Sequence, residues 1–322
     1  MIVCTTVKNH LLSTSKTLLN WLLLILFTAV FLHSGDLSGQ TTKEDPRTVT
    51  QEIRELEKAK KLHVKTITAV IKQKGGFAKY SPPEGMIIQY LIFDKNGNNI
   101  EHTWFKAGKT VDRKWMYEYD QKGNITKLIG IDDLKRQQYI RESTYDEHSR
   151  EIERTEFKAN VSETYTIKYK YDSNGNLINM DMYRSDNSLA WAESYLYKGN
   201  LLMEKNSYNE KGDKASTMQY KHNDAGLIIE EINQDAPEGY RSMNKYKYDE
   251  KGRLTEHITP NSRQLFSYNE NGDVVEDILF NGFGGRQHKF EFTYLPNGLL
   301  NQRLKYSPTD KLDYIITYHY EY

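Results

Sequence analysis

The chain has 322 residues and a formal net charge of zero, because 44 Lys and Arg residues balance 44 Asp and Glu residues. A neutral chain has no global field with which to attract nucleic acid or an anionic membrane. The mean hydropathy of −0.76 excludes a bundle of membrane helices, the single Cys excludes a disulfide scaffold, and 24 Tyr residues argue against disorder.

Residues 1–39 have the pattern of a targeting segment. Lys8 and Lys16 precede the apolar run 18–32, and mostly small and polar residues follow that run as far as Gly39. A basic start, an apolar core and a small-residue exit are typical of a secretory signal peptide. Because a spanning helix needs about 20 residues, we predict cleavage after Gly39 rather than a membrane anchor. We therefore expect an exported protein, periplasmic or secreted, with no stable membrane anchor after cleavage.

Residues 40–63 are predicted to form a linker and a short amphipathic helix. The Asp45 side chain can accept amide hydrogen bonds at a helix start, and Pro46 is tolerated at the first helical position. Apolar residues then recur at helical spacing over 46–61. We expect this helix to cover one exposed end of the neighbouring domain. A helix that binds a partner is the alternative.

The remaining residues, 64–322, are periodic. The repeated marker is an aromatic residue, then Asp or Asn, two further residues and Gly, as in Tyr171–Gly175 and Tyr248–Gly252. Complete and degenerate markers begin at positions 93, 119, 145, 171, 197, 222, 248, 268, 294 and 320. Eight of these nine steps are 25 or 26 residues long, and the exception of 20 residues falls near Pro260. A period of this length indicates an array of supersecondary units.

Each unit has room for two strands and two turns. In the marker turn, the Asp side chain can accept an amide bond two residues on, and Gly takes a positive φ without steric cost. Before the marker, aromatic residues alternate with mostly polar residues, as at Tyr165, Tyr169 and Tyr171. This period of two predicts antiparallel strands with one aromatic face and one wet face.

The predicted fold class is all-β, an antiparallel β-hairpin repeat ribbon with a period of about 26 residues. About twenty strands at ~4.8 Å would form a flat ribbon ~95 Å wide. One bare aromatic face on such a ribbon would be a large sticky patch. We therefore expect the ribbon to curl, with its aromatic face inward, into an open spiral or a barrel-like shell.

The unit Tyr-Asp-x-x-Gly-Asn/Arg-Leu resembles the YD repeat of RHS-type proteins. The clearest copies are Tyr171–Leu177 and Tyr248–Leu254, and the resemblance covers about four fifths of the chain, the YD-like β-repeat domain 64–322. In that family the repeats wind into a β-shell, found in bacterial insecticidal toxin subunits, RHS polymorphic toxins and animal teneurins. For a short chain with a signal peptide, the resemblance implies a cell-envelope or secreted protein of Gram-negative bacteria. Ten units are few for a closed container, and no toxin domain follows, so the encapsulation of cargo is less expected.

The pattern of reactive residues does not predict an enzyme. The only cysteine, Cys4, precedes the apolar run, so the cleaved chain has no thiol nucleophile. The turn Asp94–Asn98 lacks the distant acidic ligands of a calcium loop, and no helix follows the glycine-rich segment Asn281–Gly285 to bind phosphate. Histidines that follow the predicted cleavage point are His63, His102, His148, His222, His257, His288 and His319. No pair among them has the close spacing of a zinc site.

Basic and acidic residues are interleaved along the chain, so we predict no nucleic-acid partner. We also predict no enzymatic activity and no cofactor, and we assign no catalytic, cofactor-binding, metal or ligand-binding residue. The function predicted is an exported non-catalytic repeat protein that binds an extended ligand, such as a polysaccharide or an envelope protein, because repeated surfaces bind polymers multivalently. Wet-face residues such as Lys170 and Lys247 are expected to contribute. The alternative is a scaffold or shell component of an RHS/toxin-like assembly. The sequence leaves the oligomeric state open.

Overall fold

The computed structural model describes residues 51–74, 82–106, 110–235 and 239–322. The predicted signal peptide, its cleavage point and the predicted helix start at Asp45 and Pro46 lie outside these residues. All described residues belong to one compact unit, Gly39–Tyr322. None of the helices in the described part of the chain has the length and apolarity needed to cross a membrane.

The described chain begins with one helix and continues as a series of strands. The helix is α2 (Gln51–Lys61). The strands in chain order are β1 (Thr66–Gln73), β2 (Met86–Phe93), β3 (Asn99–Phe105), β4 (Val111–Tyr119), β5 (Ile125–Asp132), β6 (Gln137–Tyr145), β7 (Glu151–Lys158), β8 (Glu163–Tyr171), β9 (Leu177–Arg184), β10 (Leu189–Lys198), β11 (Leu201–Tyr208), β12 (Lys214–His222), β13 (Ile228–Asp235), β14 (Arg241–Tyr248), β15 (Leu254–Thr259), β16 (Ser262–Tyr268), β17 (Val274–Asn281), β18 (Arg286–Tyr294), β19 (Leu300–Tyr306) and β20 (Leu312–Glu321).

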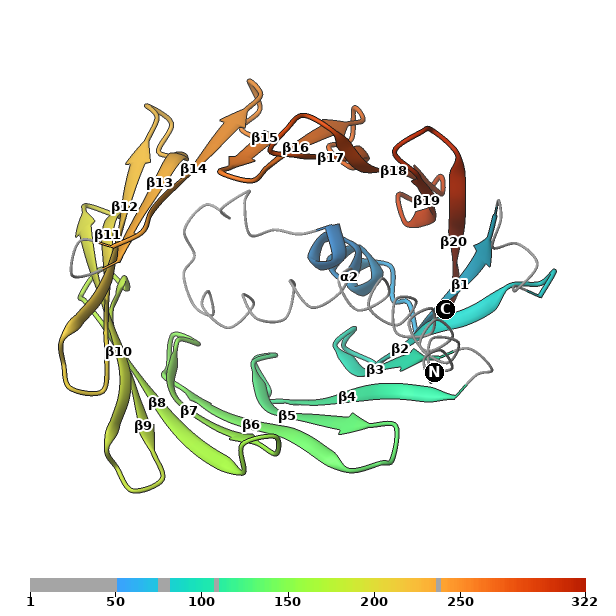
Figure 1. Ribbon diagram of the computed structural model, residues 1–322. Coiled ribbons are helices and arrows are strands. Elements are labelled where there is room, and N and C mark those ends of the chain that lie inside the picture. The colour runs from blue at the N-terminus through green and yellow to red at the C-terminus, as the bar shows by residue number, and fades with distance from the viewer. Residues whose placement is uncertain (1–50, 75–81, 107–109, 236–238) are drawn as a thin grey trace, which may run out of the picture. The chain divides into compact units, whose positions relative to one another are not determined.

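These strands form a single antiparallel sheet that closes on itself. Each strand pairs with its neighbours in sequence, and β1 also pairs with β20. This closing seam runs in unbroken register from Thr66 opposite Glu321 to Gln73 opposite Tyr314. The predicted all-β hairpin repeat is therefore confirmed, and of the two predicted forms the structure has the closed barrel (Figure 1).

The marker turns follow the even-numbered strands and therefore lie together on one edge of the barrel, called here the marker edge. In the turn at Tyr171, the Asp172 carboxylate accepts hydrogen bonds from the backbone N–H groups of Asn174 and Asn176 at 2.9 and 2.8 Å. The backbone N–H of Gly175 donates to the Asp172 carbonyl at 3.1 Å, and Gly175 has a φ of +86°. The turn chemistry predicted from the sequence is thus present. The other hairpin turns lie on the opposite edge, called the far edge.

A register shift follows each complete marker turn and decides which side chains face inward. Tyr119 lies opposite Ile125, but Glu118 lies opposite Lys127, so Thr126 is the extra residue of a β-bulge. Beyond the bulge, Leu128 lies opposite Tyr117 on the face that carries the aromatic residues. The inward alternation after a marker turn is therefore displaced by one residue.

Helix α2 packs against the inner face at the marker edge and spans the seam. Its fully buried Ala59 belongs to a cluster with Ile67, Phe93 and Leu299, against which Tyr320 also packs. On the β20 side of the seam, the backbone N–H of Leu300 donates to the Glu55 carboxylate at 2.9 Å. On the β1 side, Lys60 Nζ donates to Asn98 Oδ1 at 2.9 Å. The helix therefore braces both sides of the closing joint.

The aromatic face of the sheet looks inward, as the sequence predicts. Tyr318 and Tyr320 pack against the same cluster as α2, and α2 lies inside the ring of strands in Figure 1. A closed ring of twenty strands at ~4.8 Å has a circumference of ~95 Å and a diameter of ~30 Å. Side chains of a single sheet are too short to fill a barrel of this size. The side chains of the sheet alone therefore do not meet across the barrel, and α2 packs against part of the inner face.

Candidate functional site

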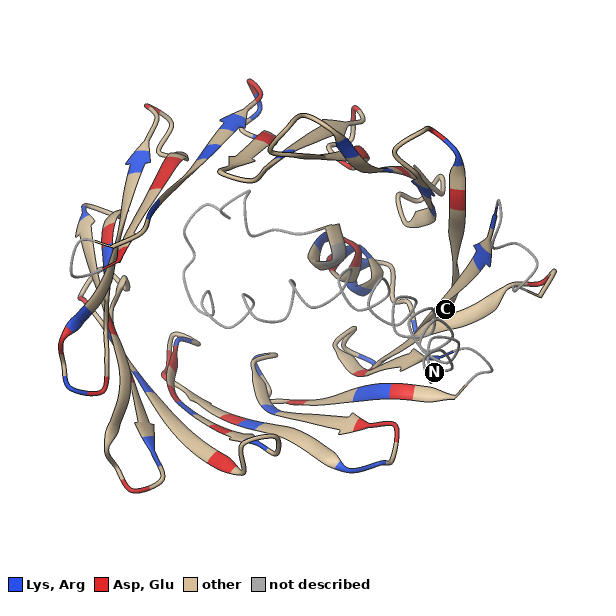
Figure 2. Cartoon of the chain, in the orientation of Figure 1, with Lys and Arg blue, Asp and Glu red and all other residues tan. Residues whose placement is uncertain are grey.

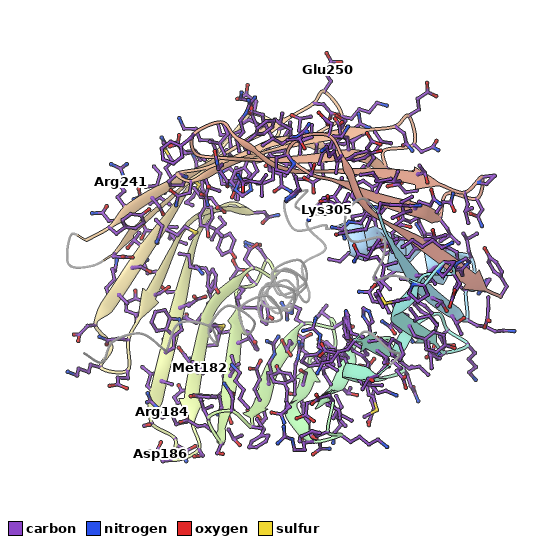
Figure 3. The ribbon with its side chains drawn as sticks, turned by 45° about the vertical axis from the view of Figure 1, so that its right-hand side comes forward. Met182, Arg184, Asp186, Arg241, Glu250 and Lys305 are labelled. Carbon is purple, nitrogen blue, oxygen red and sulfur yellow. The ribbon has the colours of Figure 1, made fainter. Side chains whose placement is uncertain are left out.

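The inner wall combines aromatic and polar side chains, some of them buried, such as Trp104 and Phe290, and others only partly buried. On β8, Tyr165 and Tyr171 face inward at intermediate exposure, whereas Lys168 and Lys170 on the opposite face are exposed. The wall also carries charged residues on both faces, and in Figure 3 Lys305 lies on its inner side and Arg241 on its outer side. Partly exposed aromatic rings on a concave wall are typical of ligand-binding surfaces.

One aromatic platform is formed by β4, β5 and β6. Gly130 lies between Trp115 and Tyr139 in register, and the two rings meet edge to face with centroids 5.5 Å apart. A Cβ at Gly130 would lie 3.0 Å from Trp115 Cζ3 and 3.2 Å from Tyr139 Cβ. The absence of a side chain at Gly130 therefore lets the indole lie flat against the sheet.

A second platform lies on β3 and β4 beside the first. The imidazole of His102 stacks on Trp104 with ring centroids 3.6 Å apart, and the Arg113 guanidinium carbon lies 4.9 Å from the Trp104 ring centroid. Burial and then the positive charge of Arg113 lower the pKa of His102 to about 3. His102 is therefore neutral at physiological pH, and Arg113 carries the charge of this platform.

A third platform lies across the seam, on β18, β19 and β20. The Arg303 guanidinium carbon lies 3.9 Å from the Phe290 ring centroid, and Lys305 Nζ lies 5.5 Å from the Tyr314 ring centroid. Burial, followed by the charges of Lys305 and Arg303, lowers the pKa of His288 to about 4. Like the second platform, this one is aromatic and positively charged.

On β6 and β7, by contrast, the inward charges neutralise one another. Glu151 is fully buried and accepts hydrogen bonds from Arg141 at 3.0 Å and from Arg154 at 2.5 Å. Burial alone would raise the pKa of Glu151, but Arg154 and Arg141 hold it below its usual range. Other units have an apolar residue at this offset from the marker, for example Ile125. This ion-paired cluster is a local departure from the repeat that holds its own strands together.

The outer wall is charged, and its charges are also paired across strands. Lys170 Nζ lies 3.9 Å from Asp181, and Lys247 Nζ lies 2.5 Å from Glu256, which is buried beneath it. Both lysines, which the sequence analysis expects to contribute to ligand binding, therefore have a carboxylate partner on the outer face. Figure 2 shows blue and red segments interspersed along the strands.

Several apolar side chains protrude from the far edge. They belong to the turns β5–β6, β7–β8, β13–β14 and β17–β18, and they are Leu134, Val161, Tyr240 and Phe283. Phe283 is fully exposed at the tip of the β17–β18 turn, between Gly282 and Gly284. The glycine-rich segment Asn281–Gly285 is thus a hairpin turn.

The described residues contain no group of three or more His, Cys, Asp or Glu side chains arranged to hold a metal ion. In the turn that superficially resembles a calcium loop, Asp94 Oδ1 accepts the backbone N–H groups of Asn96 and Asn98, each at 2.8 Å. Asp94 Oδ2 accepts the Asn98 side-chain amide at 3.1 Å. Both carboxylate oxygens of Asp94 therefore accept hydrogen bonds from within the turn itself.

Comparison with known proteins finds structural likeness at low identity. No protein-family model matches the chain, and no curated protein matches it. Similar solved structures include the TcdB2-TccC3-Cdc42 complex, with 14% identity over 74% of this chain and a TM-score of 0.38. A porin-like protein from Bacteroides uniformis has 9% identity over 80% of this chain and 98% of its own length, with a TM-score of 0.35. A porin-like protein from Bacteroides vulgatus has 11% identity over the same shares of both chains, with a TM-score of 0.23.

The chain spans only 16% of the length of the matched TcdB2-TccC3-Cdc42 chain. With every one of these TM-scores below 0.5, the likenesses identify neither a family nor a function. The fold therefore rests on the strand pairings of the chain itself, and membership of the YD-repeat family stays a prediction.

Proposed function

We propose that the chain is an exported, non-catalytic shell that binds an extended polysaccharide along its inner wall. The observation that supports this most directly is the set of half-buried aromatic side chains on the inner wall, of which Trp115 and Tyr139 form one platform and Tyr165 and Tyr171 lie on β8. Flat aromatic faces suit the apolar faces of sugar rings, and the polar groups beside them suit sugar hydroxyls. Because the platforms follow one another around the wall, a polymer gains from several weak contacts at once.

The proposal is tested by binding of the purified protein, expressed from the full chain, to an array of neutral and acidic polysaccharides. Trp115→Ala removes one platform and is expected to weaken binding about tenfold, the order of a single lost stacking contact. The outer-wall variants Lys170→Ala and Lys247→Ala are the matched controls and are expected to bind as the parent does. A blank array from a folded, β-rich sample would overturn the polysaccharide version and direct attention to an envelope protein.

The second candidate function is a scaffold or shell component of a toxin-like assembly, and the far edge is the feature that favours it. Leu134, Val161, Tyr240 and Phe283 are exposed in four separate turns of that edge, so only a partner that covers much of the edge would bury all four. The test is co-elution with the product of a neighbouring toxin-like coding sequence. Phe283→Ser should abolish that co-elution while polysaccharide binding is unchanged. Co-elution that survives Phe283→Ser would exclude this edge as the contact.

A further inference from the structure

Two arginines on the inner wall have no hydrogen-bond acceptor for part of their guanidinium group. Arg303 lies over Phe290 and Arg113 lies over Trp104, and the Nε atom of each arginine is buried without a partner within the described chain. A guanidinium is charged at every physiological pH and carries only donors. Burying such donors without an acceptor costs free energy.

Other inward-facing arginines show that the wall elsewhere supplies acceptors. Arg154 is bound by Glu151 and lies 3.4 Å from Glu156, and Arg141 is bound by Glu151. Arg286 donates to the Pro308 carbonyl at 2.9 Å and lies 2.8 Å from Asp310. Arg303 and Arg113, by contrast, take part in no ion pair within the described residues. Among the described residues, the guanidinium groups of Arg303 and Arg113 therefore form no ion pair, and the charge of Arg303 acts on Asp277 only from beyond ion-pair distance.

The electrostatic surroundings of both arginines favour an anion. Lys305 lies beside Arg303, and its nearest carboxylate, Asp313, is 3.8 Å away. The other acid near Arg303 is Asp277, which accepts a hydrogen bond from Gln264 at 2.8 Å and whose pKa is raised by burial. The pKa of His102 and of His288 is lowered first by burial and then by the neighbouring cations, Arg113 in the first case and Lys305 and Arg303 in the second.

We propose that the ligand is a carboxylate-bearing polysaccharide, and that Arg303 and Arg113 each bind one of its uronate groups. This inference rests on the proposed function and names the chemistry of its ligand. Both arginines are only partly buried, so the terminal nitrogens of each guanidinium, rather than its buried Nε, would meet a planar carboxylate in a two-bond contact. The aromatic ring beneath each guanidinium holds that group in a fixed orientation before the ligand binds, so little side-chain entropy is lost on binding.

The distance between the two arginines sets the length of the ligand. Arg303 is on β19 and Arg113 is on β4, and four strands, β20, β1, β2 and β3, lie between them. Five strand spacings correspond to about 24 Å along the wall. One monosaccharide cannot reach both arginines, whereas an oligomer can. Affinity is therefore expected to rise steeply with chain length, and galacturonic acid monomer is expected to bind weakly.

The experiment measures binding of the full-length protein to polygalacturonate, to heparin as a sulfated chain, and to dextran as a neutral chain. Arg303→Gln and Arg113→Gln are each expected to weaken polygalacturonate binding at least about tenfold, because a hydrogen bond to a charged group is lost. Dextran binding should be unaffected by both changes. Arg136→Gln, which removes an exposed turn residue paired with Asp132, is the control. In the parent protein, added NaCl should weaken polygalacturonate binding and leave dextran binding unchanged.

Stability separates a binding role from a structural one. Because the Nε of Arg303 and of Arg113 is buried without an acceptor in the free protein, the glutamine variants are expected to unfold at the same temperature as the parent, or higher. Polygalacturonate should raise the unfolding temperature of the parent and not that of the double variant. Destabilised glutamine variants would overturn the inference, as would equal binding of dextran and polygalacturonate or a preference for heparin. In the last two cases the proposed function stands, whereas failure to bind any polysaccharide overturns both.

Discussion

The hydroxyl of Tyr171 donates a hydrogen bond at 2.8 Å to the carbonyl oxygen of Glu151, twenty residues earlier. Tyr119, Tyr145, Tyr248, Tyr294 and Tyr320 make the same bond to the residue twenty positions before them. Tyr268 makes it to Leu254, only fourteen positions earlier, because its unit is six residues shorter. Each of these seven tyrosines thus bonds to the backbone just after the preceding marker turn, forming a belt of hydrogen bonds along the marker edge.

Removing one hydroxyl from this belt should weaken the barrel without changing its shape. Tyr171→Phe deletes the donor and leaves the Glu151 carbonyl without it, so a loss of about 1 kcal/mol in the free energy of unfolding is expected. Urea unfolding measures this loss. Tyr183→Phe, on the outer face, is the control and should be neutral. An equal loss of unfolding free energy in both variants would contradict a stabilising role for the Tyr171 hydrogen bond.

Helix α2 should stabilise the seam more than the rest of the sheet. The belt is interrupted there, because the marker residue Phe93 has no hydroxyl and packs against Ala59 instead. Ala59→Leu overfills a fully buried position and should cost about 1–3 kcal/mol. Hydrogen exchange should accelerate in β1 and β20 and stay unchanged in β8 and β9. Lys61→Leu, on an exposed helix position, should leave exchange unaffected, and uniform acceleration across the barrel would contradict a local role for α2.

Stability should fall between pH 6.5 and pH 4 in a way that depends on His102. Its pKa is about 3 in the folded chain and 6.5 in the unfolded chain, so the unfolded chain binds the proton more tightly in this range. Unfolding is therefore favoured as the pH falls below 6.5, and this one group costs about 2–3 kcal/mol at pH 4.5. His102→Phe keeps a ring beside Trp104 and removes the titration. Urea midpoints at pH 7 and pH 4.5 should differ less for this variant than for the parent, and an equal difference would exclude His102 as a source.

The acidic residue of the marker turn should be replaceable by its amide. Asn269 already occupies this place in the Tyr268 turn and accepts the backbone N–H of Asp273 at 2.9 Å. Asp172→Asn keeps an acceptor and should leave the unfolding temperature nearly unchanged, whereas Asp172→Ala removes the acceptor and should lower it. Hydrogen bonds from Asn176 hold the Asp172 pKa below its usual range, so acid should weaken the parent turn and not the Asn variant. Thermal unfolding at neutral and acidic pH compares the three proteins.

The repeat, its hairpins and the inward aromatic face could be predicted from the sequence because each depends on neighbours within one unit. The spacing of the markers predicts where the hairpins lie. The alternation of aromatic and polar residues before each marker, as at Tyr165 and Tyr169, predicts which side chains share the inward aromatic face. Closure depends instead on β1 meeting β20, a pairing between residues such as Ile67 and Tyr320 that no single unit contains. The position of α2 on the inner face depends on that closure, so it could not be predicted either.

The arginine platforms were missed for a more local reason. Plain alternation from Leu300 would place Gln302 inward and Arg303 outward. The bulge after the marker turn reverses this, and Arg303 lies opposite Phe292 on the inner face. In the unit of Tyr119 the equivalent inward positions are Leu128 and Gly130. Counting nine and eleven residues from each marker, rather than alternating from the turn, would have identified the inward positions after it.

Because β20 pairs with β1, the repeat units form a closed ring although the chain itself is linear. Ile67 lies opposite Tyr320 just as Ile125 lies opposite Tyr119, although the first pair is joined by no marker turn. Every unit therefore has the same two kinds of neighbour, and the sheet itself does not distinguish the first unit from the others. A circular permutant opened at another marker turn, with its old ends linked, would enclose the same space with the same wall.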